Sequence, residues 1–114
     1  MSIINTWSIN SNLDVKYEII FSEKIFEKNN KSILKYGDQL ANRKRLIVID
    51  NNVSKYYFEQ ILEYFDQNKI LTKFLIVEGG EENKNLDNLF KILETIEQFG
   101  VSRRNEPIIA IGGG

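Results

Sequence analysis

The stretch LIVIDNN, residues 46–52, decides the fold of this chain. Its first four residues form a continuous branched apolar run, which is typical of a strand buried on both faces, and the Asp and Asn residues that follow favour a turn. Downstream, apolar side chains recur at helical spacing, at Val53, Tyr57, Ile61, Tyr64 and Phe65. We therefore predict a central strand over 46–49 and an amphipathic helix over 53–65.

Two more apolar runs follow the same pattern. FLIV at 74–77 ends at Glu78-Gly79-Gly80, and IIAI at 108–111 ends at Gly112. Between them, apolar residues recur at helical spacing over 86–96, with Asn85 as the predicted N-cap and Gly100 as the stop. Strands that alternate with helices across short turns predict an α/β fold with a parallel sheet and right-handed crossovers.

Three further expectations concern the rest of the chain. Tyr17–Phe21 alternates loosely and predicts a strand, paired with another around Thr6–Ile9, whereas Asn42–Arg45 reads as a surface turn. Both faces of a parallel sheet need cover, and the chain carries no helix after its last strand. We therefore expect the sheet face at Ile109 or its neighbours to stay exposed, with marginal stability or self-association as the result.

The composition excludes several classes of protein. The 114 residues, 42% of them hydrophobic, suffice for one globular domain. The 15 basic and 16 acidic residues nearly cancel, so the chain has no net positive charge that would attract nucleic acid. Cysteine and histidine are absent, so disulfides, thiolate nucleophiles and histidine base chemistry are excluded. Without a signal peptide or an apolar run of ~20 residues, the expected location is the cytoplasm and not a membrane.

Candidate binding residues lie where the predicted strands end, because parallel strands bring their carboxyl ends to one crevice. Asp50 has a carboxylate that accepts hydrogen bonds from ribose hydroxyls, and Asn52 adds an amide. The alternative is that the two residues only form the turn and cap the following helix.

Two glycine-containing turns are the other candidates. Gly113 and Gly114 allow the backbone to approach a pyrophosphate closely, or they form a flexible end. Glu81 and Lys84 are suited to hold the hydroxyls or phosphate of a nucleotide, or they belong to a polar loop before a helix. Neither GxGxxG nor the Walker motif is present.

Taken together, three segments resemble the sugar phosphate cyclase superfamily, which includes 3-dehydroquinate synthase. They are Asp50–Val53, Gly79–Lys84 and Arg103–Gly114, and the resemblance extends from about Trp7 to the last residue. The second segment and the Arg-Arg-Asn-Glu-Pro run look more like the sedoheptulose 7-phosphate cyclases, such as 2-epi-5-epi-valiolone synthase. The resemblance implies a Rossmann-like parallel sheet with flanking helices over residues 1–114. This is expected to be an incomplete NAD-binding N-terminal domain of that fold, truncated after the glycine-rich loop.

The resemblance also implies roles for single residues. Asp50 and Asn52 would lie by the adenosine ribose, Glu81 and Lys84 would bind the nucleotide, and Gly113 and Gly114 would face the pyrophosphate. The family oxidises a sugar hydroxyl with NAD, eliminates phosphate and closes a carbocycle with a divalent metal, zinc or cobalt, in what is expected to be a homodimer.

The resemblance further implies that the C-terminal helical domain with the metal ligands is absent from these residues, so we expect no catalytic residue and no metal ligand here. Three alternatives stay open. They are 3-dehydroquinate synthase, a polyol dehydrogenase of the metal-dependent alcohol dehydrogenase group, which the Glu81 and Lys84 spacing disfavours, and a non-catalytic nucleotide-binding fragment.

Overall fold

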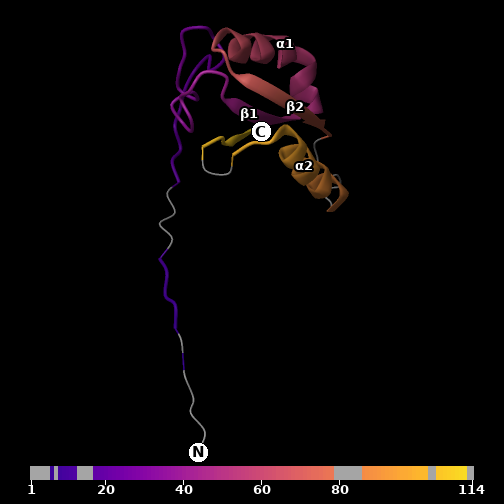
Figure 1. Cartoon of the computed structure of the whole chain (residues 1–114). Helices are drawn as coiled ribbons and strands as arrows, with labels where there is room; N and C mark the ends of the chain where they lie inside the picture. The colour runs from indigo at the N-terminus through magenta and orange to yellow at the C-terminus, as the bar shows by residue number, and fades with distance from the viewer. Residues whose placement is uncertain (1–5, 7, 13–16, 79–85, 103–104, 113–114) are drawn as a thin grey trace, which may run out of the picture.

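The computed structural model of this protein describes all residues except 1–5, 7, 13–16, 79–85, 103–104 and 113–114. Its elements are β1 (Lys44–Asp50), α1 (Asn51–Gln67), β2 (Leu71–Val77), α2 (Leu86–Phe99) and β3 (Ile108–Ile111). The three strands form one parallel sheet in the order β2-β1-β3, with α1 and α2 on opposite sides of it (Figure 1). The predicted α/β fold and the central position of the first apolar run are confirmed.

The core lies between α1 and one face of the sheet. Ile47 and Ile49 of β1 alternate onto this face and are fully buried, as are Ile61 and Phe65 of α1. Tyr64 lies beside Phe65, and the two rings meet edge to face at 5.3 Å between centroids. The helical spacing of these α1 residues places them on one stripe, and the burial of that stripe holds α1 to the sheet.

The outer strands differ from the prediction of runs buried on both faces. In β2, Leu71 is 48% exposed and Ile76 is 47% exposed, because β2 forms an edge of the sheet and α1 and α2 cover it only in part. In β3, Ile109 is partly buried against the core, whereas Ile108 and Ala110 on the opposite face are exposed. The expected exposure therefore falls on the neighbours of Ile109, not on Ile109 itself.

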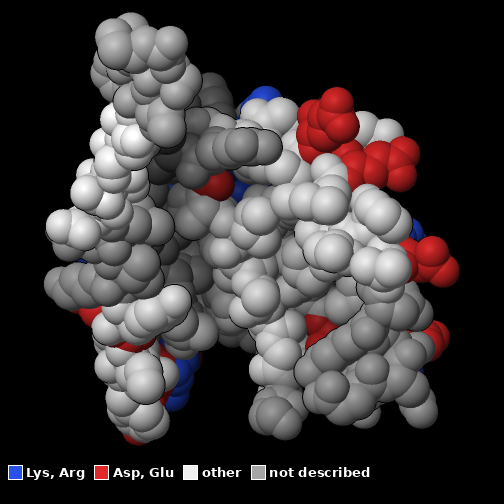
Figure 2. All heavy atoms as spheres, turned by 90° about the horizontal axis from the view of Figure 1, so that it is seen from below, with Lys and Arg blue, Asp and Glu red and all other residues white. Residues whose placement is uncertain are grey.

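The second helix leaves much of its apolar stripe in solvent. Leu86, Leu89, Phe90 and Leu93 are all at least 48% exposed. Figure 2 views the molecule from the side of α2, where a broad uncharged surface is bordered by acidic side chains. Exposed apolar side chains on one face of a helix favour association with another surface.

The predicted strand at Tyr17–Phe21 is wrong, because these residues form no strand in the structure. Tyr17, Ile19 and Phe21 are 88–103% exposed, and the segment pairs with neither edge of the sheet. Alternation alone does not make a strand, since a ladder needs a partner that accepts and donates the backbone hydrogen bonds. Within the predicted partner Thr6–Ile9, the described residues are also outside any strand.

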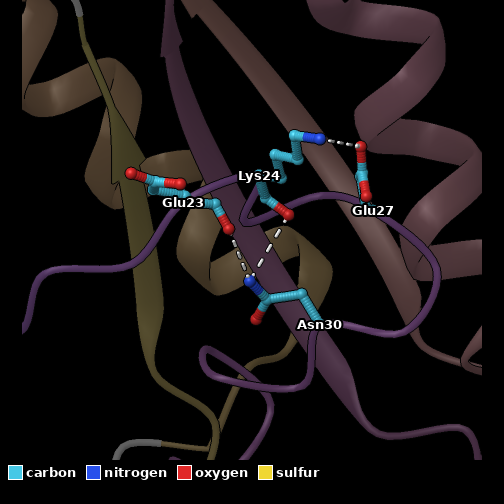
Figure 3. A network of polar contacts seen from close by, with 4 residues as sticks. All are labelled: Glu23, Lys24, Glu27 and Asn30. Atoms are coloured by element: carbon cyan, nitrogen blue, oxygen red, sulfur yellow. Dashed lines mark hydrogen bonds and ion pairs between the residues drawn. The ribbon is translucent and has the colours of Figure 1, made fainter.

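A compact turn joins this N-terminal segment to the core. The side-chain amide of Asn30 donates to the carbonyl oxygens of Glu23, at 3.0 Å, and Lys24, at 3.4 Å (Figure 3). The carbonyl of Asn30 accepts from the buried hydroxyl of Tyr64 at 2.5 Å, and burial raises the pKa of that hydroxyl. Phe26 then packs edge to face on Tyr64, so the turn closes one side of the core.

The prediction of a surface turn over Asn42–Arg45 is wrong for its second half, which opens β1. Arg45 is only 2% exposed. Its guanidinium donates to the carbonyl oxygens of Lys44, Tyr36 and Asp38 at 2.7, 3.1 and 2.9 Å. A buried charge needs such partners, and these bonds fasten the 36–38 turn to the amino end of β1.

Within the described part of the chain, no helix has both the length and the apolar character that crossing a membrane requires.

We expect the substitution Gly37→Ala to destabilise the fold more than Gly100→Ala. Both glycines have left-handed backbones, with φ of 79° and 73°, which costs another residue about 1–2 kcal/mol. A Cβ at Gly37 would also lie 2.3 Å from Cδ of Pro107, whereas at Gly100 the nearest atom is a lysine Nζ at 3.5 Å. Urea unfolding should therefore show an additional loss of about 1–3 kcal/mol for Gly37→Ala. Equal losses would show that the approach of Gly37 to Pro107 is unimportant.

We also expect the 114-residue chain to self-associate, because the α2 stripe and the β3 face leave apolar surface in water. Burying that surface against a second copy gains about 25 cal/mol of free energy per Å². Sedimentation velocity at several concentrations should show species larger than a monomer. Replacing Leu89 and Phe90 by Gln should shift the distribution toward the monomer, whereas Lys91→Gln on the same helix should not. A monodisperse wild-type monomer that melts cooperatively would contradict this expectation.

Candidate functional site

The carboxyl ends of the three strands lie side by side at one edge of the sheet. Asp50, the last residue of β1, pairs in register with Val77, the last residue of β2. On the other side of β1, Ile49 pairs with Ile111, the last residue of β3. Whatever follows these strands therefore starts from the same edge, which is the arrangement that the sequence predicts for a shared crevice.

The strand order creates a topological switch point at this edge. The chain leaves β1 through α1 to β2 on one side, and it leaves β2 through α2 to β3 on the other side. Right-handed crossovers in opposite directions place the two helices on opposite faces, as Figure 1 shows. In open α/β sheets, ligands bind in the crevice outside the strand ends where the connections diverge, here between β1 and β3.

Asp50 lies at this point and caps α1. One carboxylate oxygen, Oδ2, accepts from the backbone amides of Asn52 at 3.1 Å and Val53 at 3.3 Å. The backbone of Asp50 is extended, with φ −62° and ψ 138°, as an N-cap requires. Among the described residues, no group bonds the other oxygen, Oδ1, so capping occupies half of the carboxylate and leaves an acceptor at the edge.

Asn52 lies in the first turn of α1, and its side chain is exposed. Its backbone amide is engaged by Asp50, so the two residues act together in starting the helix. The side-chain amide has no hydrogen-bond partner among the described residues. The structure thus brings Asp50 and Asn52 together, and the capping interpretation and the binding interpretation are compatible.

Gly112 is exposed immediately after β3. A Cβ built on it would have no atom within 4 Å, so the space beside this backbone is open. The remaining predicted site residues, Glu81, Lys84, Gly113 and Gly114, lie outside the described residues, as does the predicted N-cap Asn85. Their roles stay predictions.

Sequence reasoning treated Glu78 only as part of the turn that ends a strand. In the structure it is exposed directly after Val77, the partner of Asp50, so a second carboxylate is located at the same edge. The signal that identifies it is its position directly after the second strand, equivalent to that of Asn51 after the first. Among the described residues, no three acidic side chains gather closely enough to hold a metal ion.

The comparisons with known proteins agree with this geometry. No family model matches the chain. The chain is 34% identical over 109 residues to 2-epi-5-epi-valiolone synthase from Streptomyces albus, and the aligned region covers 95% of this chain and 27% of the relative. It is 33% identical over 102 residues to 3-dehydroquinate synthase from Prochlorococcus marinus, and the aligned region covers 89% of this chain and 27% of that relative.

A solved structure has the same fold. It is that of ValA, a 2-epi-5-epi-valiolone synthase from Streptomyces hygroscopicus subsp. jinggangensis with NAD⁺ and Zn²⁺ bound, and it superposes with a TM-score of 0.73 at 22% identity. The match covers 90% of this chain and 27% of that protein, so the chain spans about a quarter of the length of the relatives it matches. Over nearly its whole length this chain is therefore similar in sequence to 2-epi-5-epi-valiolone synthases and 3-dehydroquinate synthases, in agreement with the predicted resemblance to the sugar phosphate cyclases, and it shares the fold of ValA.

Proposed function

We propose that this chain is the NAD-binding portion of a sugar phosphate cyclase that converts sedoheptulose 7-phosphate to a carbocyclic product of the 2-epi-5-epi-valiolone type. The observation that carries the proposal is the meeting of Asp50 and Gly112 at the switch point of a parallel sheet, in a chain related to such synthases. ValA, whose fold this chain shares, binds NAD⁺.

The proposed site combines two described residues, Asp50 and Asn52, with four that lie outside the described part of the chain. In the proposal, the open Oδ1 of Asp50 accepts from ribose hydroxyls, while Oδ2 keeps its bonds to the first turn of α1. Asn52 adds an exposed amide beside it. Glu81 and Lys84 bind the nucleotide from the turn after β2, and Gly113 and Gly114 let the backbone approach the pyrophosphate.

Bound NAD would supply oxidation of a sugar hydroxyl, the step that makes phosphate elimination possible. The residues of this chain bind and orient that cofactor. We assign no metal ligand here, because the chain has neither histidine nor cysteine and its described acidic residues form no cluster of three. In the proposal the 114 residues are an N-terminal domain, and the metal site and the homodimer belong to a full-length cyclase.

A second candidate is 3-dehydroquinate synthase, because relatives of that name match at similar identity. The 2-epi-5-epi-valiolone synthases match over 95–96% of the chain and the 3-dehydroquinate synthases over 64–89%, which favours the former. A nucleotide-binding fragment without activity is the third candidate.

We expect two substitutions of Asp50 to separate capping from binding. Asp50→Ala should lose about 0.5–2 kcal/mol of stability and weaken NAD binding, because it removes the cap and the acceptor together. Asp50→Asn should keep the stability, since Asn caps as well as Asp does, but should still weaken binding about tenfold or more by the loss of a charged hydrogen bond. Urea unfolding and calorimetric titration with NAD measure the two effects.

Asp66→Asn is the matched control, because it removes the same charge from an exposed position at the other end of α1. It should leave NAD affinity unchanged. Lys84→Ala should weaken binding to a similar degree as Asp50→Asn. Changes of about twofold or less for both Asp50→Asn and Lys84→Ala would remove the site assignment.

We expect the 114-residue chain alone to release no phosphate from sedoheptulose 7-phosphate in the presence of NAD and zinc. The physical reason is that a histidine-free chain lacks the ligands with which proteins usually hold zinc. A phosphate-release assay measures this, with a characterised 2-epi-5-epi-valiolone synthase as the positive control. Clear turnover would show that catalytic groups lie within these residues.

A further inference from the structure

The position of Gly112 relative to Asp50 depends on how a very short strand is aligned. β3 has four residues, and its pairing with β1 runs from Leu46 with Ile108 to Ile49 with Ile111. So few ladder bonds specify a register weakly, yet this register decides which residue after β3 lies next to the end of β1.

Side-chain alternation excludes half of the other registers. Ile109 and Ile111 pack toward the core, whereas Ile108 and Ala110 face the other side. A slip of one residue would exchange the two sets between the faces, which the burial of Ile109 opposes. A slip of two residues keeps every side chain on its face, and it moves β3 along β1 by about 6.6 Å. Something else must oppose that slip.

The carboxylate of Glu106 is placed to do so. Its Oε2 accepts from the backbone amide of Lys44 at 2.6 Å, and its Oε1 accepts from the backbone amide of Ser102 at 2.7 Å. Glu106 precedes Ile108 by two residues, just as Lys44 precedes Leu46 by two. The side chain therefore continues the β1–β3 ladder by one place at the amino edge, in the observed register.

Contacts with Gly37 and Asp38 hold Asn105 and Pro107, the residues on either side of Glu106. The carbonyl of Asn105 accepts from the amide of Asp38 at 2.5 Å, and Gly37 lies so close to Pro107 that a Cβ has no room. The buried Arg45 also holds residues 36–38, because it donates to the carbonyl oxygens of Tyr36 and Asp38.

The buried guanidinium of Arg45 interacts electrostatically with Glu106. Burial lowers the pKa of Arg45, Arg43 lowers it further, and Glu106 and Asp38 oppose that change. The ammonium of Lys44 is directed elsewhere, to the carbonyl of Phe99 at 3.1 Å. A carboxylate between two peptide amides and near a buried guanidinium is held by charge-assisted bonds, which are stronger than neutral ones.

We propose that Glu106 is a positioning residue for the nucleotide site: it selects the register of β3 and thereby sets the position of Gly112 relative to Asp50. This inference rests on the proposed function. Glu106 does not reach the site itself, because it binds the amino end of β1 and Asp50 is six residues along that strand, about 20 Å away. Any effect of Glu106 on NAD binding must pass through the position of β3.

The test compares three variants of the 114-residue chain. Glu106→Ala removes both bonds and should weaken NAD binding about tenfold or more. Glu106→Gln keeps one acceptor oxygen and should recover part of that affinity. Tyr64→Phe is the control, because it removes a buried hydrogen bond on the α1 side of the core without touching β3. It should lower the unfolding midpoint and leave NAD affinity unchanged at a temperature where every variant is folded.

Backbone NMR supplies a readout that does not depend on NAD. Cross-strand contacts between Leu46 and Ile108 should be present in the wild type and in Tyr64→Phe, and they should be lost or shifted by two residues in Glu106→Ala. The amide of Gly112 should move with them.

The outcomes separate the two hypotheses. Unchanged cross-strand contacts in Glu106→Ala, or unchanged NAD affinity in both Glu106 variants, would overturn the positioning role. Failure of the wild-type chain to bind NAD would instead contradict the proposed function, while the NMR comparison still decides whether Glu106 selects the register. If Glu106→Ala does not fold, the NAD affinity and the Leu46–Ile108 contacts of Glu106→Gln decide whether Glu106 selects the register.

Discussion

The parallel pairing of β1 with a strand on each side is the interaction on which the rest of this structure depends. The apolar run at 46–49 can stand at the centre of the sheet because it carries no charge and accepts neighbours on both edges. Since all three strands point the same way, their carboxyl ends share one edge. The helices that connect them lie on opposite faces of the sheet, so the switch point between β1 and β3 follows from the pairing and not from any single side chain.

The two ends of the sheet carry different kinds of contact. At the carboxyl end, Asp50 and Gly112 leave an acceptor and an open backbone beside each other. At the amino end, Arg45 and Glu106 bond to backbone groups of neighbouring segments, and Gly37 allows close contact with Pro107. A site built from short turns needs such support, because a loop residue is positioned no better than the strand from which it extends.

For Asp50, the observed capping role and the proposed binding role need not compete. A helix N-terminus requires an acceptor for its free amides, and a ribose requires an acceptor for its hydroxyls. A carboxylate has two oxygens, and here only Oδ2 is used by the helix. The side chain that starts α1 therefore keeps one carboxylate oxygen, Oδ1, without a bond to a described residue, as the proposed contact with ribose requires.

The sequence by itself determined the local elements: apolar runs and helical spacing identified β1, α1, α2 and β3, because period and composition follow from which face is buried. It also predicted that Asp50 and Asn52 follow a central strand. Only the tertiary structure decided what depends on partners distant in the chain. Tyr17–Phe21 has the pattern of a strand but no ladder to join, and Arg45 is buried because the carbonyls of the 36–38 turn surround it. The bond from Lys44 to Glu106 joins residues 62 positions apart, a contact that no local pattern encodes.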